Sequence, residues 1–286
     1  MSASHLRTLL ILGRVSNLPT VWSNCFAAWT LAGGGAASRL ALVLASGTCL
    51  YVGGIFLNDA CDAEFDRRQR PERPIPSGLI SHGAVWAWAS GTLLAGALLA
   101  VPLGSRAFAC ALALLAAIVA YDFWHKRHPA ALGLMAGCRL LLYLFAGIAA
   151  AGAAAPVVLT AAAGMAAYVL GISLLARHES GANSPPEWPL LLLAAPAVTA
   201  GINFSAGVSG TTALAGILFI TSLAFALLPL RQVKPQTGRA VGRLLAGIVF
   251  ADCLQVAAVA PSLAHAALFA ACFGLTLLLQ RRVPAT

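Results

Sequence analysis

The sequence predicts an all-α polytopic membrane protein, a bundle of about nine to ten transmembrane helices that forms one domain over residues 1–286. Three observations predict this fold class. Hydrophobic residues make up 60% of the 286 residues and charged residues only 9%, against about 25% charged in an average soluble domain. The mean hydropathy is +0.85. Apolar stretches near the length of about 20 residues that a bilayer-crossing helix needs recur along the chain.

The breaks between these stretches carry residues that favour turns, such as Gly33-Gly34-Gly35 and Pro185-Pro186. The apolar runs are long and do not alternate with polar residues, which excludes membrane-spanning strands. The spans are rich in Ala and Gly, so that helices can pack closely in lipid. The ten predicted spans are 15–33, 40–60, 83–102, 106–124, 131–152, 156–176, 189–206, 211–230, 239–259 and 263–280.

The formal net charge of +9 would suggest nucleic acid as a partner of a soluble protein. Here the basic residues lie in short loops between apolar spans, so topology explains them and no nucleic-acid partner is expected. With a cytoplasmic N-terminus, the outer loops hold only Arg39 and Arg106. The inner loops, which include cytoplasmic loops at 60–82 and 177–188, hold Arg67, Arg68, Arg70, Arg73, Lys126, Arg127, Arg177, Arg231 and Lys234.

Carboxylates are concentrated at one place, the end of the second predicted span. Asp59, Asp62 and Asp66 are spaced three and four residues apart and share one face of a helix, with Asn58 at its edge. Like charges on one face repel, so a positive group is expected to hold them. Mg²⁺ is the natural choice, because it takes carboxylate oxygens and leaves sites open for phosphate oxygens. The alternative is a solvated helix end that only sets topology.

Four arginines follow the carboxylates within the stretch 67–78, which prolines stiffen. Guanidinium groups bind phosphate through two parallel hydrogen bonds. Carboxylates, a metal ion and arginines together predict a diphosphate-binding mouth. For any single arginine, a cytoplasmic topology charge is the alternative.

The pattern N-D-x-x-D-x-x-x-D at 58–66, followed by R-P-I-P-S-G at 73–78, resembles the first signature of the UbiA superfamily of intramembrane prenyltransferases. Arg14, Asn17 and Pro19 resemble the start of that family's first helix. The stretch 121–127 resembles its Y-x-x-x-x-K-R element, and the likeness extends roughly over residues 10–260. Stretches 70–78, 121–128 and 176–179 look like the EboC-type branch, which is associated with bacterial secondary-metabolite gene clusters.

The resemblance implies a multi-pass protein of the bacterial inner membrane in which Mg²⁺ joins the aspartates to an isoprenyl diphosphate. The allylic cation would be captured by an aromatic or other lipophilic acceptor, and the low-dielectric bundle would shield it from water. The implied roles are catalysis by Asp59, Asp62, Asp66 and Arg177; metal binding by Asn58, Asp59, Asp62, Asp66 and Glu179; diphosphate binding by Arg70, Arg73, Lys126, Arg127 and Arg177; and substrate binding by Arg14, Asn17 and Tyr121.

The sequence departs from the family at the second aspartate motif, where Glu179 is the only acid and Arg177 is a cation. Either Arg177 supplies the charge of one metal ion, or prenyl transfer has been lost. The second alternative makes the chain a non-catalytic protein that binds or transports an isoprenoid or a secondary-metabolite precursor. Asp252 lies deep in a span, where a charge is costly, and is either paired with Arg139 or Arg243 or has a role in a cavity.

Overall fold

The computed structural model describes residues 3–125, 128, 130–177, 187–205, 207–232 and 235–283. In these ranges the chain folds into twelve α-helices and three short 3-10 helices, and they contain no strand. The all-α prediction is therefore confirmed. An N-terminal helix, α1 (Ala3–Leu12), precedes the first predicted span, and the 3-10 helix η1 (Val15–Asn17) lies at the start of that span.

Eight helices are long and apolar enough to cross a membrane, counted over the described residues. They match eight of the ten predicted spans, so that the expected number of about nine to ten agrees roughly with the structure. They are α3 (Ala37–Gln69), α4 (His82–Ala100) with η2 (Val101–Leu103), α5 (Ser105–Trp124), α6 (Ala131–Ala151), α7 (Pro156–Ala176), α10 (Gly210–Leu227) with η3 (Leu228–Arg231), α11 (Thr237–Val259) and α12 (Leu263–Gln280).

The two other predicted spans are occupied by shorter helices. The span 15–33 contains α2 (Leu18–Leu31), which has 14 residues. The span 189–206 contains α8 (Pro189–Leu192) and α9 (Ala195–Ile202), which a turn at 193–194 separates. Pro196 lacks the amide hydrogen that would bond to the carbonyl of Leu192, which accounts for the interruption.

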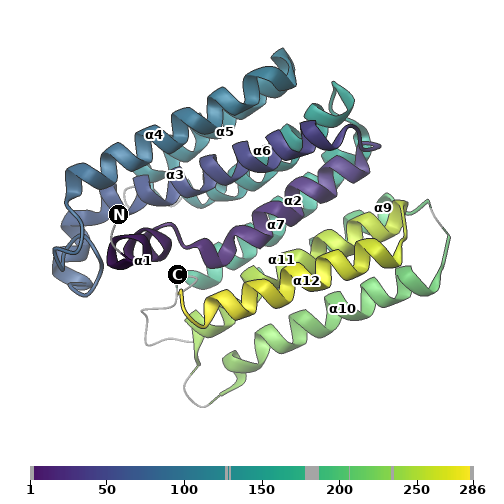
Figure 1. Cartoon of the computed structure of the whole chain (residues 1–286). Helices are drawn as coiled ribbons and strands as arrows, with labels where there is room; N and C mark the ends of the chain where they lie inside the picture. The colour runs from purple at the N-terminus through teal and green to yellow at the C-terminus, as the bar shows by residue number, and fades with distance from the viewer. Residues whose placement is uncertain are drawn as a thin grey trace.

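The long helices lie side by side, and the N- and C-termini lie at the same end of the bundle (Figure 1). The connection from α3 to α4 is at this end, which we call the terminal end. Helix α11 packs against α2, α7, α9, α10 and α12, and 83% of its most apolar 18 residues are buried. It is therefore the central helix of the half of the bundle that contains the C-terminus.

Glycine allows α3 and α4 to approach closely. A Cβ atom on Gly53 would lie 2.8 Å from Leu93 Cγ, and one on Gly96 would lie 2.8 Å from Leu50 Cγ. Close backbone packing through small residues is the usual means of holding helices together in lipid, where the hydrophobic effect does not drive association.

The two basic residues of the predicted outer loops have structural partners at the other end of the bundle. Arg39 Nη2 donates to the carbonyl oxygens of Leu103 at 2.9 Å and Ala149 at 3.0 Å. Arg106 Nη1 donates to the carbonyl of Gly152 at 3.1 Å. These carbonyls lie at or near helix C-termini, where cations are stabilising.

Candidate active site

The helix that carries the aspartates extends beyond the predicted span. Residues 60–69 were expected to begin a cytoplasmic loop over 60–82, but α3 continues to Gln69, and the non-helical part begins at Arg70. Ala60, Asp62, Ala63 and Asp66 give this extension a buried face. Pairing with nearby cations removes the charge repulsion that would otherwise destabilise it.

Asp59, Asp62 and Asp66 lie on that buried face and are 6%, 8% and 2% exposed. Arg73 folds back from the loop after α3, and its Nη1 atom lies 3.4 Å from Asp59 Oδ1 and 2.9 Å from Asp66 Oδ2. The prediction that the carboxylates share a face and face positive charge is thus confirmed. The positive group in contact with them is a side chain of the chain itself.

Arg14 approaches the same cluster from the connection between α1 and η1. Its Nη2 atom lies 3.4 Å from Asp59 Oδ1, and its backbone is left-handed, with φ 41° and ψ 48°. This is the only non-glycine residue with positive φ in the described ranges, and the conformation costs about 1–2 kcal/mol. Strained backbone of this kind is concentrated at functional sites.

We call the region around Asp59, Asp62 and Asp66 the mouth. Arg14 and Arg73 border it on one side, and Tyr121 of α5 and His125 at the C-terminus of α5 border it on the other. His125 Nε2 lies 3.3 Å from Asp62 Oδ1, and its ring stacks on that of Tyr121, with centroids 5.1 Å apart. Residues i and i+4 of a helix lie on one face, so the sequence spacing accounts for the stack.

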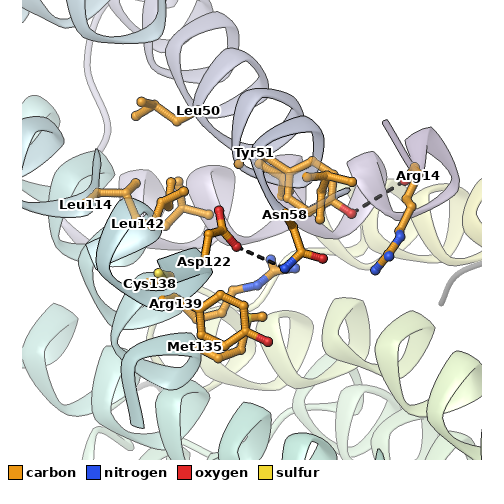
Figure 2. A pocket seen from close by; sticks show the side chains of 16 residues that line it. Arg14, Leu50, Tyr51, Asn58, Leu114, Asp122, Met135, Cys138, Arg139 and Leu142 are labelled. Carbon is orange, nitrogen blue, oxygen red and sulfur yellow. Dashed lines mark hydrogen bonds between the residues drawn. The ribbon is translucent and has the colours of Figure 1, made fainter. Parts of the chain in front are cut away.

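A cavity of about 160 Å³ lies between α2, α3, α5 and α6, below the mouth (Figure 2). Its wall is mainly apolar, with residues such as Leu50, Leu114 and Leu142. The polar residues that line it include Arg14, Tyr51, Asn58, Tyr121, Asp122 and Arg139. Two of the predicted substrate-binding residues, Arg14 and Tyr121, are therefore brought together here.

Asn58 faces α5 in the cavity wall. Its Nδ2 atom donates to Asp122 Oδ1 at 3.0 Å, as the dashed line in Figure 2 shows. Asp122 is 5% exposed, and its second carboxylate oxygen, Oδ2, is buried without a hydrogen-bond partner among the described residues. A buried acceptor without a partner is costly, and it is expected to bind a donor from a ligand or water.

Arg139 is anchored on α2 by Thr20 and Asn24. Its Nη1 atom donates to Asn24 Oδ1 at 2.6 Å, and its Nη2 atom donates to Thr20 Oγ1 at 3.2 Å. On its other side, Asn24 Nδ2 donates to Asp252 Oδ2 at 2.8 Å. Asp252 is fully buried. Asn24 thus connects the buried anion to the guanidinium that lines the cavity.

The remaining partners of Asp252 come from α2 and α6. Ser23 Oγ donates to Asp252 Oδ2 at 2.6 Å, and the Tyr143 hydroxyl donates to Oδ1. Arg243 lies elsewhere and donates to the Phe225 carbonyl. Asp252 thus forms no ion pair with Arg139 or Arg243 among the described residues, and it does not line the cavity. Its link to Arg139 runs through Asn24.

Several predicted site residues are not gathered at the mouth. Arg70 and Arg177 are exposed, and neither forms an ion pair with a described acid. Arg177 follows the last residue of α7, where the chain leaves the helix. Asn17 is buried beside Gln280 of α12, whose Nε2 atom lies 3.4 Å from Asn17 Oδ1, and it does not line the cavity. Lys126, Arg127 and Glu179 lie outside the described residues.

In the described part of the chain, no group of three or more His, Cys, Asp or Glu residues has the geometry to hold a metal ion. The donor chemistry suits Mg²⁺, because the mouth offers carboxylate oxygens from three aspartates. In the observed arrangement, Arg73 contacts one oxygen each of Asp59 and Asp66, and His125 contacts one oxygen of Asp62.

Sequence reasoning missed three contributions to the site. His125 was assigned no partner, although its spacing of four from Tyr121 places both on one helix face. Asp122 and Arg139 line the cavity, and each is a charged residue within an apolar span, which is itself a signal of function. Their meeting in one cavity depends on how α5 and α6 pack, and no short sequence pattern shows this.

The described residues form an all-helical membrane bundle with a buried acidic cluster and basic residues at the mouth of an apolar cavity. This combination defines a class of polytopic membrane proteins with a charged site at the end of the bundle. The profile of the UbiA prenyltransferase family matches residues 16–230. The chain therefore belongs to the UbiA prenyltransferase family, as the resemblance of its aspartate signature indicated.

Similar proteins agree with this membership. A digeranylgeranylglyceryl phosphate synthase from Methanoregula boonei is 37% identical over 75 residues, which are 22% of this chain and 27% of that protein. The match thus spans about a quarter of the curated relative. A UbiA homolog from Aeropyrum pernix superimposes with a TM-score of 0.62 at 18% identity, covering 84% of this chain and 96% of that one. A UbiA homolog from Archaeoglobus fulgidus bound to GPP and Mg²⁺ superimposes with a TM-score of 0.59 at 14% identity. The superposition covers 97% of this chain and 99% of that one.

Proposed function

We propose that the protein is a Mg²⁺-dependent intramembrane prenyltransferase, which moves an isoprenyl group from its diphosphate to an aromatic or lipophilic acceptor. The observation that carries the proposal is the group of three buried aspartates on α3, which faces Arg73, Arg14 and His125 at the end of an apolar cavity. Membership of a prenyltransferase family and the solved relative with GPP and Mg²⁺ support it.

Asp59, Asp62 and Asp66, with Asn58 beside them, are the residues that would hold Mg²⁺, and Glu179 would add a ligand from the second motif. Bound Mg²⁺ neutralises charge on the diphosphate and makes it a better leaving group. For these carboxylates to accept a metal ion, Arg73 must release at least one of Asp59 and Asp66, to which it is 3.4 and 2.9 Å away. The released guanidinium would then be available to bind phosphate oxygens of the diphosphate.

The basic residues near the mouth are proposed to bind the diphosphate, with Arg73 the nearest to the aspartates. In the reaction, the bond between C1 of the prenyl group and the diphosphate oxygen breaks, and its electron pair leaves with the diphosphate. The allylic cation forms a bond to the acceptor, which gives up a proton. An apolar cavity excludes the water that would otherwise capture the cation. The further proposed diphosphate contacts are Arg70, Lys126, Arg127 and Arg177.

The cavity between α2, α3, α5 and α6 is proposed to hold the acceptor. Its volume of about 160 Å³ is close to that of an engineered cavity of about 150 Å³ that binds benzene. It therefore suits a group the size of one ring. The buried Oδ2 atom of Asp122 can accept a hydrogen bond from a hydroxyl or amine of the acceptor. Arg139, held on α2, can donate to an oxygen.

The second candidate is a non-catalytic UbiA-like protein that binds or transports an isoprenoid or a secondary-metabolite precursor. The second motif favours it, because Arg177 stands where the family has acid and is exposed without an ion pair to a described carboxylate. Membership of the EboC-type branch is compatible with either candidate. It rests on the sequence stretches 70–78, 121–128 and 176–179. For both candidates we propose the bacterial inner membrane, with the terminal end in the cytoplasm.

Diphosphate release separates the two candidates. Purified protein in lipid is incubated with allylic diphosphates of several chain lengths, with and without Mg²⁺, and with cell lipid extract as the source of acceptor. An enzyme releases diphosphate and forms a prenylated product that mass spectrometry detects. Binding of a prenyl diphosphate without release at any chain length would support the non-catalytic candidate.

A further inference from the structure

A second cavity lies at the terminal end of the bundle, between the C-terminus of α10, the N-terminus of α11 and the C-terminus of α12. Its volume is about 490 Å³. It is separate from the aspartate mouth, which α3, its following loop and α5 form. The residues of its wall that matter here are Phe225, Arg239, Arg243, Leu277, Gln280 and Arg281.

The three arginines of this cavity bring like charges together without an acid among them. None of Arg239, Arg243 and Arg281 is in an ion pair with a carboxylate in the part of the chain that the structure describes. Like charges at short range destabilise each other unless an anion lies between them. The cavity is thus suited to an anionic group that the chain does not supply.

Contacts with the chain fix one of the three guanidinium groups in place. Arg243 Nη1 donates to the Phe225 carbonyl at 2.8 Å, and its Cζ atom lies 3.8 Å from the centroid of the Phe225 ring. Gln280 Nε2 donates to the Gly242 carbonyl at 3.1 Å on the neighbouring helix. A guanidinium held by a ring face and a carbonyl is preorganised to bind phosphate oxygens.

The apolar part of the wall indicates the source of the anion. Phe225 and Leu277 lie on helices long and apolar enough to cross the membrane, so that the cavity meets lipid on one side and the basic helix ends on the other. A soluble anion would not need the apolar wall. A phospholipid would place its phosphate among the arginines and its acyl chains along α10 and α12. Basic pockets between transmembrane helices bind such headgroups.

We infer that this cavity is a binding site for the phosphate headgroup of an anionic phospholipid from the adjacent leaflet. The site is independent of the proposed prenyl transfer. Basic residues that only orient a membrane protein need to lie near a helix end on the cytoplasmic side. They need neither a cavity nor a guanidinium held in place, and this site has both.

The test compares the protein in nanodiscs of phosphatidylcholine with and without phosphatidylglycerol. Native mass spectrometry counts the retained phosphatidylglycerol, and thermal unfolding gives Tm. We expect phosphatidylglycerol to raise Tm and to remain bound. Arg239→Gln and Arg281→Gln should each weaken its binding about fivefold. Arg243→Lys, which keeps the charge but loses the planar fork, should also weaken binding.

Arg231→Gln is the matched control, because Arg231 is an exposed cation at the same end of the bundle that does not line the cavity. It should retain phosphatidylglycerol as the parent does. If the three cavity variants retain as much phosphatidylglycerol as the parent, the inference is overturned. Arg-dependent stabilisation by inorganic diphosphate in phosphatidylcholine alone, equal to that by phosphatidylglycerol, would overturn the lipid assignment. Neither result depends on whether prenyl transfer occurs.

Discussion

Arg73 contacts Asp59 and Asp66 through a single nitrogen, Nη1, at 3.4 and 2.9 Å. The two carboxylates lie seven residues apart on α3, and Arg73 reaches them from the loop that follows. An internal cation therefore stands among the carboxylates proposed to bind a metal ion. The protein can fold with this acidic face buried before any ligand arrives, because Arg73 provides the compensating charge.

Arg73→Ala should destabilise the metal-free protein, because it removes the counterion of buried Asp66 and leaves buried Asp59 with Arg14 alone. Breaking a buried ion pair costs about 3–5 kcal/mol. Mg²⁺ should raise the Tm of this variant more than that of the parent, since the carboxylates are already free. Thermal unfolding across a Mg²⁺ series measures both effects.

Arg70→Ala is the control for this series, because Arg70 is an exposed cation in the same loop. Its stability should change by no more than about 0.5 kcal/mol. If Mg²⁺ stabilises Arg73→Ala no more than the parent, the aspartates do not take up the metal ion.

Asp62→Asn tests the metal assignment by itself. Asp62 lies on the same buried face, with His125 Nε2 at 3.3 Å, and the amide is a much poorer ligand than a carboxylate. We expect Mg²⁺-dependent binding of a prenyl diphosphate to weaken at least about tenfold, or about 1.4 kcal/mol. Calorimetry measures the affinity. Asp252→Asn is the control, and it should leave the Mg²⁺ dependence intact because Asp252 is bound by Ser23 and Asn24.

Much of the fold could be predicted because lipid imposes a length and a composition on each span. The ends of α7 and α12 agree with the predicted ends to the residue. The end of α3 was placed nine residues too early, because charged residues ended the apolar window although the helix continues. Burial of that segment depends on Arg73 folding back, and a rule based on hydropathy does not contain this contact.

The candidate site was predictable where its residues lie close together in the sequence. Asp59, Asp62 and Asp66 share a face because helical geometry determines it. Asn58 was predicted at the edge of that face, and in the structure its amide donates to Asp122, 64 residues away. Such long-range partners depend on how the helices pack.

The bridge between Arg139 and Asp252 predicts a large effect on stability. Asn24 accepts from Arg139 at 2.6 Å and donates to Asp252 at 2.8 Å, so Asn24→Leu removes the group that connects the buried Asp252 to the half-buried Arg139. We expect a loss of about 3–5 kcal/mol in unfolding experiments in detergent. Ser23→Ala removes one of three donors to Asp252 and should cost about 1.5–3 kcal/mol. Equal costs for the two variants would contradict the bridging role.

Asp122→Asn tests the proposed acceptor cavity. The amide keeps an oxygen that can accept from Asn58, so the fold should be preserved. At the position of Oδ2 it can present an NH₂ group, which cannot accept from a hydroxyl or amine of the acceptor. We expect KM for the acceptor to rise about tenfold, as loss of one hydrogen bond to a charged group does, with binding of the prenyl diphosphate unchanged. Kinetics at saturating prenyl diphosphate measure this KM, and an unchanged value would remove Asp122 from the acceptor site.

Arg177 decides between the two readings of the second motif. It stands where the family places acid, at the end of α7, and Glu179 is the only carboxylate beside it in the sequence. If the protein is an enzyme, Arg177 should turn toward the diphosphate when it binds and carry charge that a second metal ion would otherwise carry. Arginine suits this because its charge is fixed and its fork matches phosphate oxygens.

Product formation against Mg²⁺ concentration is measured for the parent, Arg177→Ala and Arg177→Asp. Arg177→Ala should lower the rate on the order of 10²-fold, as loss of one preorganised donor does in other enzymes. Arg177→Asp restores a metal ligand, so its rate should depend more steeply on Mg²⁺. An active parent that tolerates Arg177→Ala would make the residue a topology charge, in keeping with its exposure in the structure. A parent that forms no product at any prenyl length would favour the non-catalytic function, because binding would then persist without turnover.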